Sequence, residues 1–154
     1  MLTCDLDPSP SSRIENQVIK APTRQALIDK YVAFVKAMPG FVKYALVERR
    51  DLDMTEIIVT TATRTYSFTM IPRDMKQTLA NGQVVYKNIS CSANFRRAKS
   101  YDPDADLDLG ATCGTWVWID NGIAIQFDVN QQYLPYVPQL HDHFVKTLQR
   151  SRKN

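Results

Sequence analysis

The sequence predicts an α+β fold: a single twisted antiparallel sheet of about five to six strands, with the N- and C-terminal helices packed on one face. Helical apolar spacing appears near both ends of the chain, at residues 23–38 and 133–150. Between them, several short runs alternate apolar and polar residues as strands do. These runs come in two groups of consecutive strands, without the strand–helix alternation of a parallel sheet.

We expect the chain to divide into an arm, one domain and a tail. Its 154 residues fit one domain by length, and 44% hydrophobic with 23% charged residues is a globular composition. Residues 1–20 carry little periodicity and are expected to form a flexible N-terminal arm. Residues 21–150 form the single α+β domain, and residues 151–154 form a basic tail.

The first helix is expected to begin after Thr23, whose hydroxyl can accept a hydrogen bond from a free N–H of the first turn. Pro39 and Gly40 end the helix, because proline cannot continue it and glycine favours its exit. The apolar residues recur at helical spacing, and they are Leu27, Ile28, Tyr31, Val32, Phe34, Val35 and Met38.

Three strands are expected to follow in close order, at residues 41–49, 55–63 and 64–71. The second is a β-branched run that suits a pleated surface. In the third, aromatic residues such as Tyr66 and Phe68 alternate with threonine and serine. Such alternation is typical of an antiparallel sheet with one solvated face.

The next segments predict a short helix at residues 74–80 and a long strand at residues 84–95. Residues 96–111 are polar and are expected to form the longest loop. The last helix follows within residues 133–150. Its apolar stripe consists of Leu140, Phe144, Val145 and Leu148.

Residues 115–129 carry the strongest local signal in the chain. Asn121-Gly122 lies between two β-rich runs, and this dipeptide favours a two-residue hairpin turn. A two-residue loop would place Trp118 opposite Ile125 and Trp116 opposite Phe127. One face of the hairpin would then carry a large apolar set, namely Trp116, Trp118, Ile123, Ile125 and Phe127. We interpret this face as core; the alternative is that one tryptophan lines a pocket or a partner surface.

The chain has three cysteines, Cys4, Cys91 and Cys113, without the spacing of a zinc or thioredoxin motif. Cys91 and Cys113 fall in predicted strands. They form either a cross-strand disulfide, which would imply an oxidising compartment, or two free buried thiols. Cys4 precedes a Pro/Ser-rich spacer, as in a lipid tether, although a disordered polar terminus explains the segment better. The protein is expected to be cytoplasmic if Met1 is native, and periplasmic or otherwise exported if a leader was removed, which we slightly favour.

Several functions find no support in the sequence. A net charge of +3 with scattered basic residues does not favour nucleic-acid binding, and no run is apolar enough to span a membrane. The acidic loop beginning at Asp102 lacks the Gly and Glu of an EF-hand. His141 and His143 would point apart on a helix, so they cannot share one metal ion. We expect no metal, no cofactor and no catalytic residues.

We therefore predict a non-enzymatic protein-binding module, such as an inhibitor, an immunity-type protein or a secretion-system component. Charged residues of the 96–108 segment would steer another protein, and either an aromatic residue of the 115–129 hairpin or Tyr101 would anchor it. The candidate partner-binding residues are Arg96, Arg97, Lys99, Tyr101, Asp102, Asp104, Asp106 and Asp108. The alternative is a small apolar ligand carrier or a small enzyme with a cavity between sheet and helices. That cavity would be lined by Tyr66, Phe68, Trp116, Trp118 and Phe127.

Overall fold

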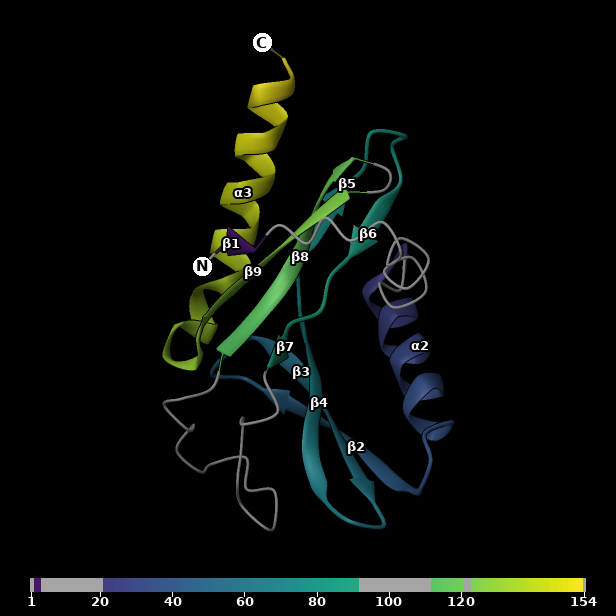
Figure 1. Cartoon of the computed structure of the whole chain (residues 1–154). Helices are drawn as coiled ribbons and strands as arrows, with labels where there is room; N and C mark the ends of the chain where they lie inside the picture. The colour runs from purple at the N-terminus through teal and green to yellow at the C-terminus, as the bar shows by residue number, and fades with distance from the viewer. Residues whose placement is uncertain (1, 4–20, 92–111, 121–122, 154) are drawn as a thin grey trace.

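The structure, a computed structural model, describes residues 2–3, 21–91, 112–120 and 123–153 (Figure 1). Within these residues the fold is α+β and every strand pairing is antiparallel, as the sequence predicts. The elements in chain order are β1 (Leu2–Thr3), α2 (Arg24–Lys36), β2 (Phe41–Arg49), β3 (Met54–Thr61), β4 (Thr65–Pro72), β5 (Lys76–Thr78), β6 (Val84–Tyr86), β7 (Ser90–Cys91), β8 (Thr112–Asp120), β9 (Ile123–Asn130), the 3-10 helix η1 (Gln131–Tyr136) and α3 (Val137–Arg152).

The described strands form three sheets, so the prediction of one sheet of about five to six strands is wrong. Four strands lie in the order β1-β9-β8-β7, three lie in the order β2-β3-β4, and β5 pairs with β6. The four-stranded and three-stranded sheets meet at one isolated bridge. There Met70 and Ile89 exchange backbone hydrogen bonds of 2.9 and 2.7 Å.

The division arises in the segment that was predicted as one long strand, residues 84–95. Its described part contains two short strands, β6 and β7, which pair with different neighbours. Between them the Lys87 N–H donates to the Met75 carbonyl at 2.9 Å. The chain therefore leaves one ladder and enters another here, and no continuous strand forms.

The prediction of a helix at residues 74–80 is also wrong, because Lys76–Thr78 form strand β5, which makes a hairpin with β6. The cause lies far away in sequence. The side-chain amide of Gln77 binds the backbone of Trp118 at two points, with Nε2 2.6 Å from the Trp118 carbonyl oxygen and Oε1 2.9 Å from the Trp118 nitrogen. These non-local bonds hold Gln77 in an extended segment.

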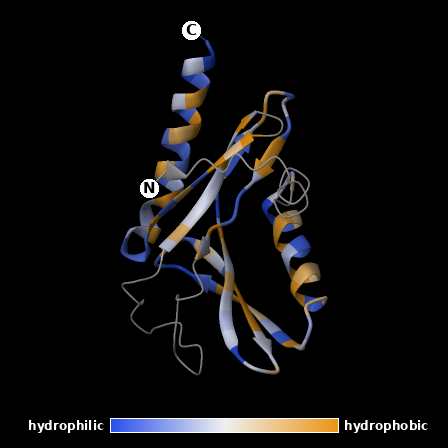
Figure 2. Cartoon of the chain, in the orientation of Figure 1, coloured by the Kyte–Doolittle hydropathy of each residue, from blue (hydrophilic) through white to orange (hydrophobic). Residues whose placement is uncertain are grey.

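The two helices cover different sheets, so the expectation that both pack on one face of a single sheet is wrong as well (Figure 1). Helix α2 packs on β3 and β4, where it buries Leu27 and Val35 against Ile57 and Ile71. Helix α3 packs on the β8–β9 hairpin through Val137 and other apolar residues. Both helices alternate hydrophobic and hydrophilic residues along their length, as expected for helices with one buried side (Figure 2).

Helix α2 begins where the sequence predicts. The Thr23 hydroxyl accepts a hydrogen bond of 3.1 Å from the Ala26 N–H, which satisfies one of the free N–H groups of the first turn. Arg24 then fixes the start of the helix to the sheet, because its guanidinium donates to the Ile71 carbonyl at 3.1 Å and to the Pro72 carbonyl at 3.2 Å.

The β8–β9 hairpin forms, but with a different register from the predicted one. Asp120 pairs with Ile123, as a two-residue connection requires, whereas residues 121–122 themselves lie outside the described part. An irregularity between Trp118 and Asp120 then shifts the pairing by one residue. The pairs that result are Trp118 with Ala124, Val117 with Ile125, Trp116 with Gln126 and Thr115 with Phe127.

This shift puts the two tryptophans on the opposite face from Phe127, so the predicted common face of Trp116, Trp118, Ile123, Ile125 and Phe127 is wrong. Side chains alternate along a strand, and one extra residue exchanges the two faces beyond it. Phe127 lies in the core under α3, with its ring centroid 5.0 Å from that of Phe144. Trp118 is only 3% exposed but lies on the other side of the sheet.

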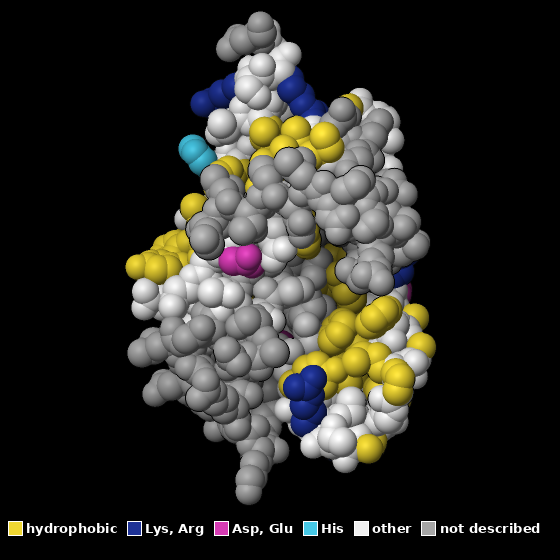
Figure 3. All heavy atoms as spheres, in the orientation of Figure 1, with side chains coloured by type: hydrophobic (Ala, Val, Ile, Leu, Met, Phe, Trp, Pro, Cys, Tyr) yellow, Lys and Arg dark blue, Asp and Glu magenta, His cyan; other side chains and the backbone are white. Residues whose placement is uncertain are grey.

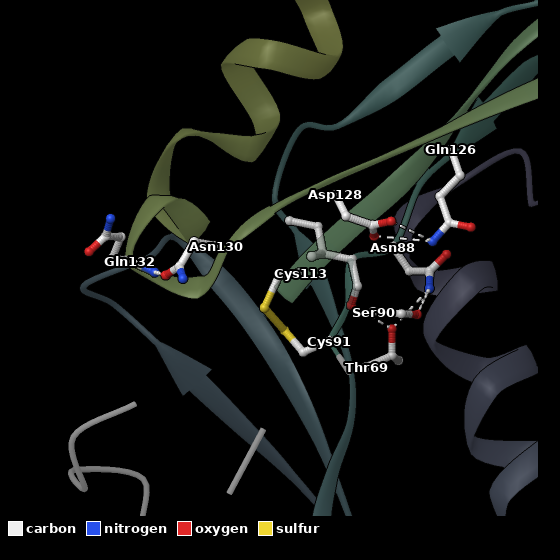
Figure 4. The surroundings of a disulfide bond; sticks show 10 residues. Thr69, Asn88, Ser90, Cys91, Cys113, Gln126, Asp128, Asn130 and Gln132 are labelled. Atoms are coloured by element: carbon white, nitrogen blue, oxygen red, sulfur yellow. Dashed lines mark hydrogen bonds between the residues drawn. A yellow bond between two sulfur atoms is a disulfide. The ribbon is translucent and has the colours of Figure 1, made fainter. Parts of the chain in front are cut away.

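Cys91 and Cys113 lie opposite each other in β7 and β8 and are joined by a disulfide (Figure 4). The bond links residues 22 positions apart and sits at the edge of the α3 core. The disulfide reinforces the attachment of the two-residue strand β7 to β8, because the two strands are paired at two positions, Ser90 with Gly114 and Cys91 with Cys113.

Gly114 allows β8 and β9 to approach closely next to this disulfide. A Cβ at this position would lie 2.1 Å from the Phe127 carbonyl oxygen and 2.2 Å from the Asp128 carboxylate. Because the first of these neighbours is backbone, it cannot move without disturbing the ladder. Only glycine fits the observed spacing.

We predict that Gly114→Ala lowers the free energy of unfolding by at least about 3 kcal/mol, because it overpacks the strand pair. Chemical denaturation followed by circular dichroism measures the change. Gly82→Ala is the matched control: it has no neighbour within 4 Å and should lose only about 1 kcal/mol, through its positive φ of 81°. Equal losses for the two variants would contradict the close approach at Gly114.

Candidate functional site

A group of aromatic side chains from α2, β2 and β4 lies partly open to solvent. We call it the aromatic surface and define it by Phe34, Phe41, Tyr44, Tyr66 and Phe68. Phe34 is 54% exposed and stacks on Phe68 with ring centroids 5.7 Å apart. The centroids of Phe41 and Tyr44 are 6.5 Å apart. Figure 3 shows hydrophobic side chains gathered over α2 and the neighbouring strands, with Lys or Arg at the border.

The aromatic surface is continuous with the buried core under α2. Tyr31, one turn before Val35 on the buried side of α2, meets Phe68 edge-on at a centroid distance of 6.0 Å. Phe68 thus touches a buried ring on one side and the exposed Phe34 on the other. The rings outside are consequently held in place by packed rings inside, which makes the surface preformed.

Two cations lie over rings of this surface. Lys36 Nζ is 5.3 Å from the Tyr44 ring centroid, and Arg64 Cζ is 4.4 Å from that of Tyr66. Neither cation has a carboxylate within salt-bridge distance in the described part of the chain. Cation–π contacts of this kind stabilise an exposed site only weakly, so both charges stay available to an acidic partner.

Further apolar side chains continue the surface along β2. Val42 is 59% exposed and Leu46 is 46% exposed, and no residue of β2 is fully buried. A single exposed apolar side chain needs no explanation, but a contiguous group is typical of an interaction site. The aromatic surface and these two β2 residues together form such a group.

A second cluster is buried and polar, and it consists of Lys87 and His141 near strand β8. Lys87 is 2% exposed; its Nζ donates to the Trp116 carbonyl at 3.0 Å and lies 5.8 Å from the Trp118 ring centroid. Burial lowers the pKa of Lys87 to about 7. Burial and the nearby charge of Lys87 lower the pKa of His141, which is 1% exposed, to about 4. Within the described residues, His141 Nε2 has no hydrogen-bond partner.

A third group of polar residues surrounds the disulfide (Figure 4). Asn88 Nδ2 donates to the Thr69 hydroxyl at 3.0 Å and to the Ser90 hydroxyl at 3.2 Å. Gln126 Nε2 donates to both oxygens of the Asp128 carboxylate, at 3.1 and 3.2 Å. Each of these polar side chains is hydrogen-bonded to another residue of the group, which indicates a structural role. Among the described residues no group of three or more His, Cys, Asp or Glu side chains could hold a metal ion.

The residues predicted to line one cavity lie in different parts of the fold. Tyr66 and Phe68 pack beside the α2 core and belong to the aromatic surface. Phe127 belongs to the α3 core. Trp118 is buried, with Lys87 Nζ over its ring. Trp116 is half-buried on the same face of the hairpin.

The predicted partner-binding residues, which run from Arg96 to Asp108, lie outside the described residues, as does Cys4. Their role stays a prediction. Phe34, Tyr44 and Leu46 were not predicted as surface residues. Tyr44 and Leu46 could have been identified from the run of apolar residues on both faces of 41–49, which is unusual for a strand with one face in water.

No protein-family model, curated protein or solved structure matches this chain. In the part of the chain that the structure describes, neither helix combines the length and apolarity needed to cross a membrane. A functional hypothesis must therefore start from the three groups of residues described above.

We predict that stability rises with pH in two steps. His141 binds protons more weakly in the folded than in the unfolded state, so folding opposes its protonation below its ordinary pKa. Between about pH 4 and 6.5 the free energy of unfolding should rise by roughly 3 kcal/mol. Lys87 should add a second rise from about pH 7 to 10.5 by the same mechanism.

Urea denaturation at a series of pH values measures both steps. His141→Leu should flatten the lower step, whereas His143→Leu, an exposed histidine on the same helix, should leave it as in the wild type. Lys87→Met should flatten the upper step. A lower step that survives in His141→Leu would show that the protons bind elsewhere.

Proposed function

We propose that this protein is a binding module without enzymatic activity, that it works in an oxidising compartment, and that its aromatic surface docks an acidic protein partner. The observation that carries the proposal is a preformed group of rings, with Phe34 54% exposed, flanked by two cations without carboxylate partners in the described region. Aromatic side chains are the usual anchors of protein interfaces, and cations at the border select partners by charge.

The compartment is inferred from the disulfide between Cys91 and Cys113. Structural disulfides persist in exported proteins and are rare where glutathione and thioredoxin keep thiols reduced. This bond holds a two-residue strand to the main hairpin, which is a structural rather than a catalytic position. An exported location is therefore the better explanation for the pair.

We predict that thiol trapping in intact producing cells will label at most one of the three cysteines, Cys4, until a reductant is added. Acid quenching, alkylation and intact mass measurement count the labelled thiols. After reduction and unfolding, all three should react. Three labelled thiols before reduction would place the protein in a reducing compartment and remove that part of the proposal.

We predict that a photo-crosslinking amino acid at position 34 forms one discrete adduct with a partner protein in the producing cells. The adduct should fall by about tenfold in the charge-reversed variants Lys36→Glu and Arg64→Glu, because an acidic partner loses its attraction. Mass spectrometry of the adduct should find the crosslink in a segment rich in Asp or Glu.

The matched control places the same crosslinker at Gln149, an exposed residue of α3 on the other sheet. It should give no adduct with that protein. Circular dichroism confirms that each variant is folded. Equal adducts at both positions, or an adduct indifferent to charge reversal, would contradict docking at the aromatic surface.

A further inference from the structure

Strand β2 borders the aromatic surface with an open edge. It pairs with β3 on one side, and within the described residues no strand pairs with its other side. With nine residues it is long for an edge strand. In the four-stranded sheet, by contrast, β9 pairs with β8 on one side and in part with β1 on the other, where Leu2 pairs with Phe127. Edges of this length are templates for an added strand unless something blocks them.

The irregular pairing that protects many edge strands is confined to one end of β2. A register irregularity lies between Phe41 and Lys43, where the strand bends and Val42 is left exposed. From Tyr44 to Arg49 the pairing with β3 is regular, one residue opposite one residue. From Tyr44 to Glu48 the strand therefore has the regular backbone geometry that a new ladder of hydrogen bonds needs.

The side chains along this edge define what would fit. Tyr44 pairs with Val59 and Leu46 with Ile57, so both lie on the face that α2 covers. A strand added beside β2 would place every second side chain next to Tyr44 and Leu46, where apolar groups gain most from burial. Lys36, whose Nζ lies over the Tyr44 ring, favours acidic side chains on this face of the added strand. Lys43 precedes Tyr44 and projects from the opposite face of β2, where it favours them as well.

We propose that the partner binds by adding an extended, acidic and partly apolar segment to the open edge of β2. The inference rests on the proposed function and specifies its mode of binding. Charge favours an acidic segment over a second copy of this chain as the occupant, because the chain itself carries a net charge of +3. Backbone hydrogen bonds supply the affinity, and alternate side chains supply the specificity.

The probe is a soluble peptide of about ten residues that alternates valine and glutamate. The control probe replaces every glutamate by lysine. Amide resonances of the isotope-labelled full chain report binding residue by residue. With the glutamate peptide, the amides of Tyr44–Arg49 should shift, and alternate ones should exchange with deuterium at least about tenfold more slowly.

The lysine peptide should bind at least about tenfold more weakly. Leu46→Glu, at an exposed position on the edge, should weaken the glutamate peptide to a similar degree and leave the fold intact, because it removes an apolar contact and adds a like charge. Shifts confined to the aromatic surface, without protection in β2, would overturn strand addition and leave the proposed function standing. Binding that ignores the sign of the peptide would overturn it too. Failure of the crosslinking at position 34 would instead remove the proposed function itself.

Discussion

The arrangement of the fold depends on the way the edge of β8 is satisfied. In the described part of the chain, β7 pairs with β8 at Gly114 and Cys113. Further along, the side chains of Lys87 and Gln77 bind the backbone of Trp116 and Trp118 where a strand would otherwise do so. Buried backbone groups need partners, and here side chains supply them. The segment that carries these side chains can therefore form its own hairpin, β5–β6, instead of joining the larger sheet.

The use of side chains in place of a neighbouring strand explains why the protein has two cores. Because β5 and β6 do not extend the β8–β9 sheet, the backbone of the three-stranded sheet β2-β3-β4 joins that sheet, among the described residues, at the bridge between Met70 and Ile89. Each sheet then needs its own helix to bury an apolar face, and α2 and α3 supply one each. The arrangement has a cost: it buries the amine of Lys87, which donates to the Trp116 carbonyl and lies over the Trp118 ring.

The sequence predicts what local rules control. The start of α2 at Thr23 and the strand at residues 41–49 follow from capping and from alternation, and the structure places both there. The errors occur where a distant contact decides. Lys76–Thr78 form a strand because Gln77 binds Trp118, 41 residues away. The tryptophans change faces because one extra residue enters β8 near Trp118, and nothing in the local sequence marks that position.

The aromatic surface, too, is set partly by local sequence and partly by distant contacts. Tyr66 and Phe68 could be selected from the sequence as large rings on one strand face, although not as part of this surface. Whether Phe34 is buried or exposed depends on how α2 is rotated on the sheet, and helical spacing alone includes it among the apolar residues. Sequence periodicity finds an apolar stripe but does not give its width, and the border of that stripe is where the surface lies.

The position of the cations fits a surface that must stay open without associating with itself. An exposed edge strand beside exposed rings favours aggregation, and a charge on the edge is a common protection. Lys43 on β2 and Lys36 on α2 place the same sign of charge along this border. Like charges oppose a second copy, whereas the same charges attract an acidic chain. One set of residues therefore both protects the edge and selects its partner, which is why the edge and the aromatic surface are best understood as a single site.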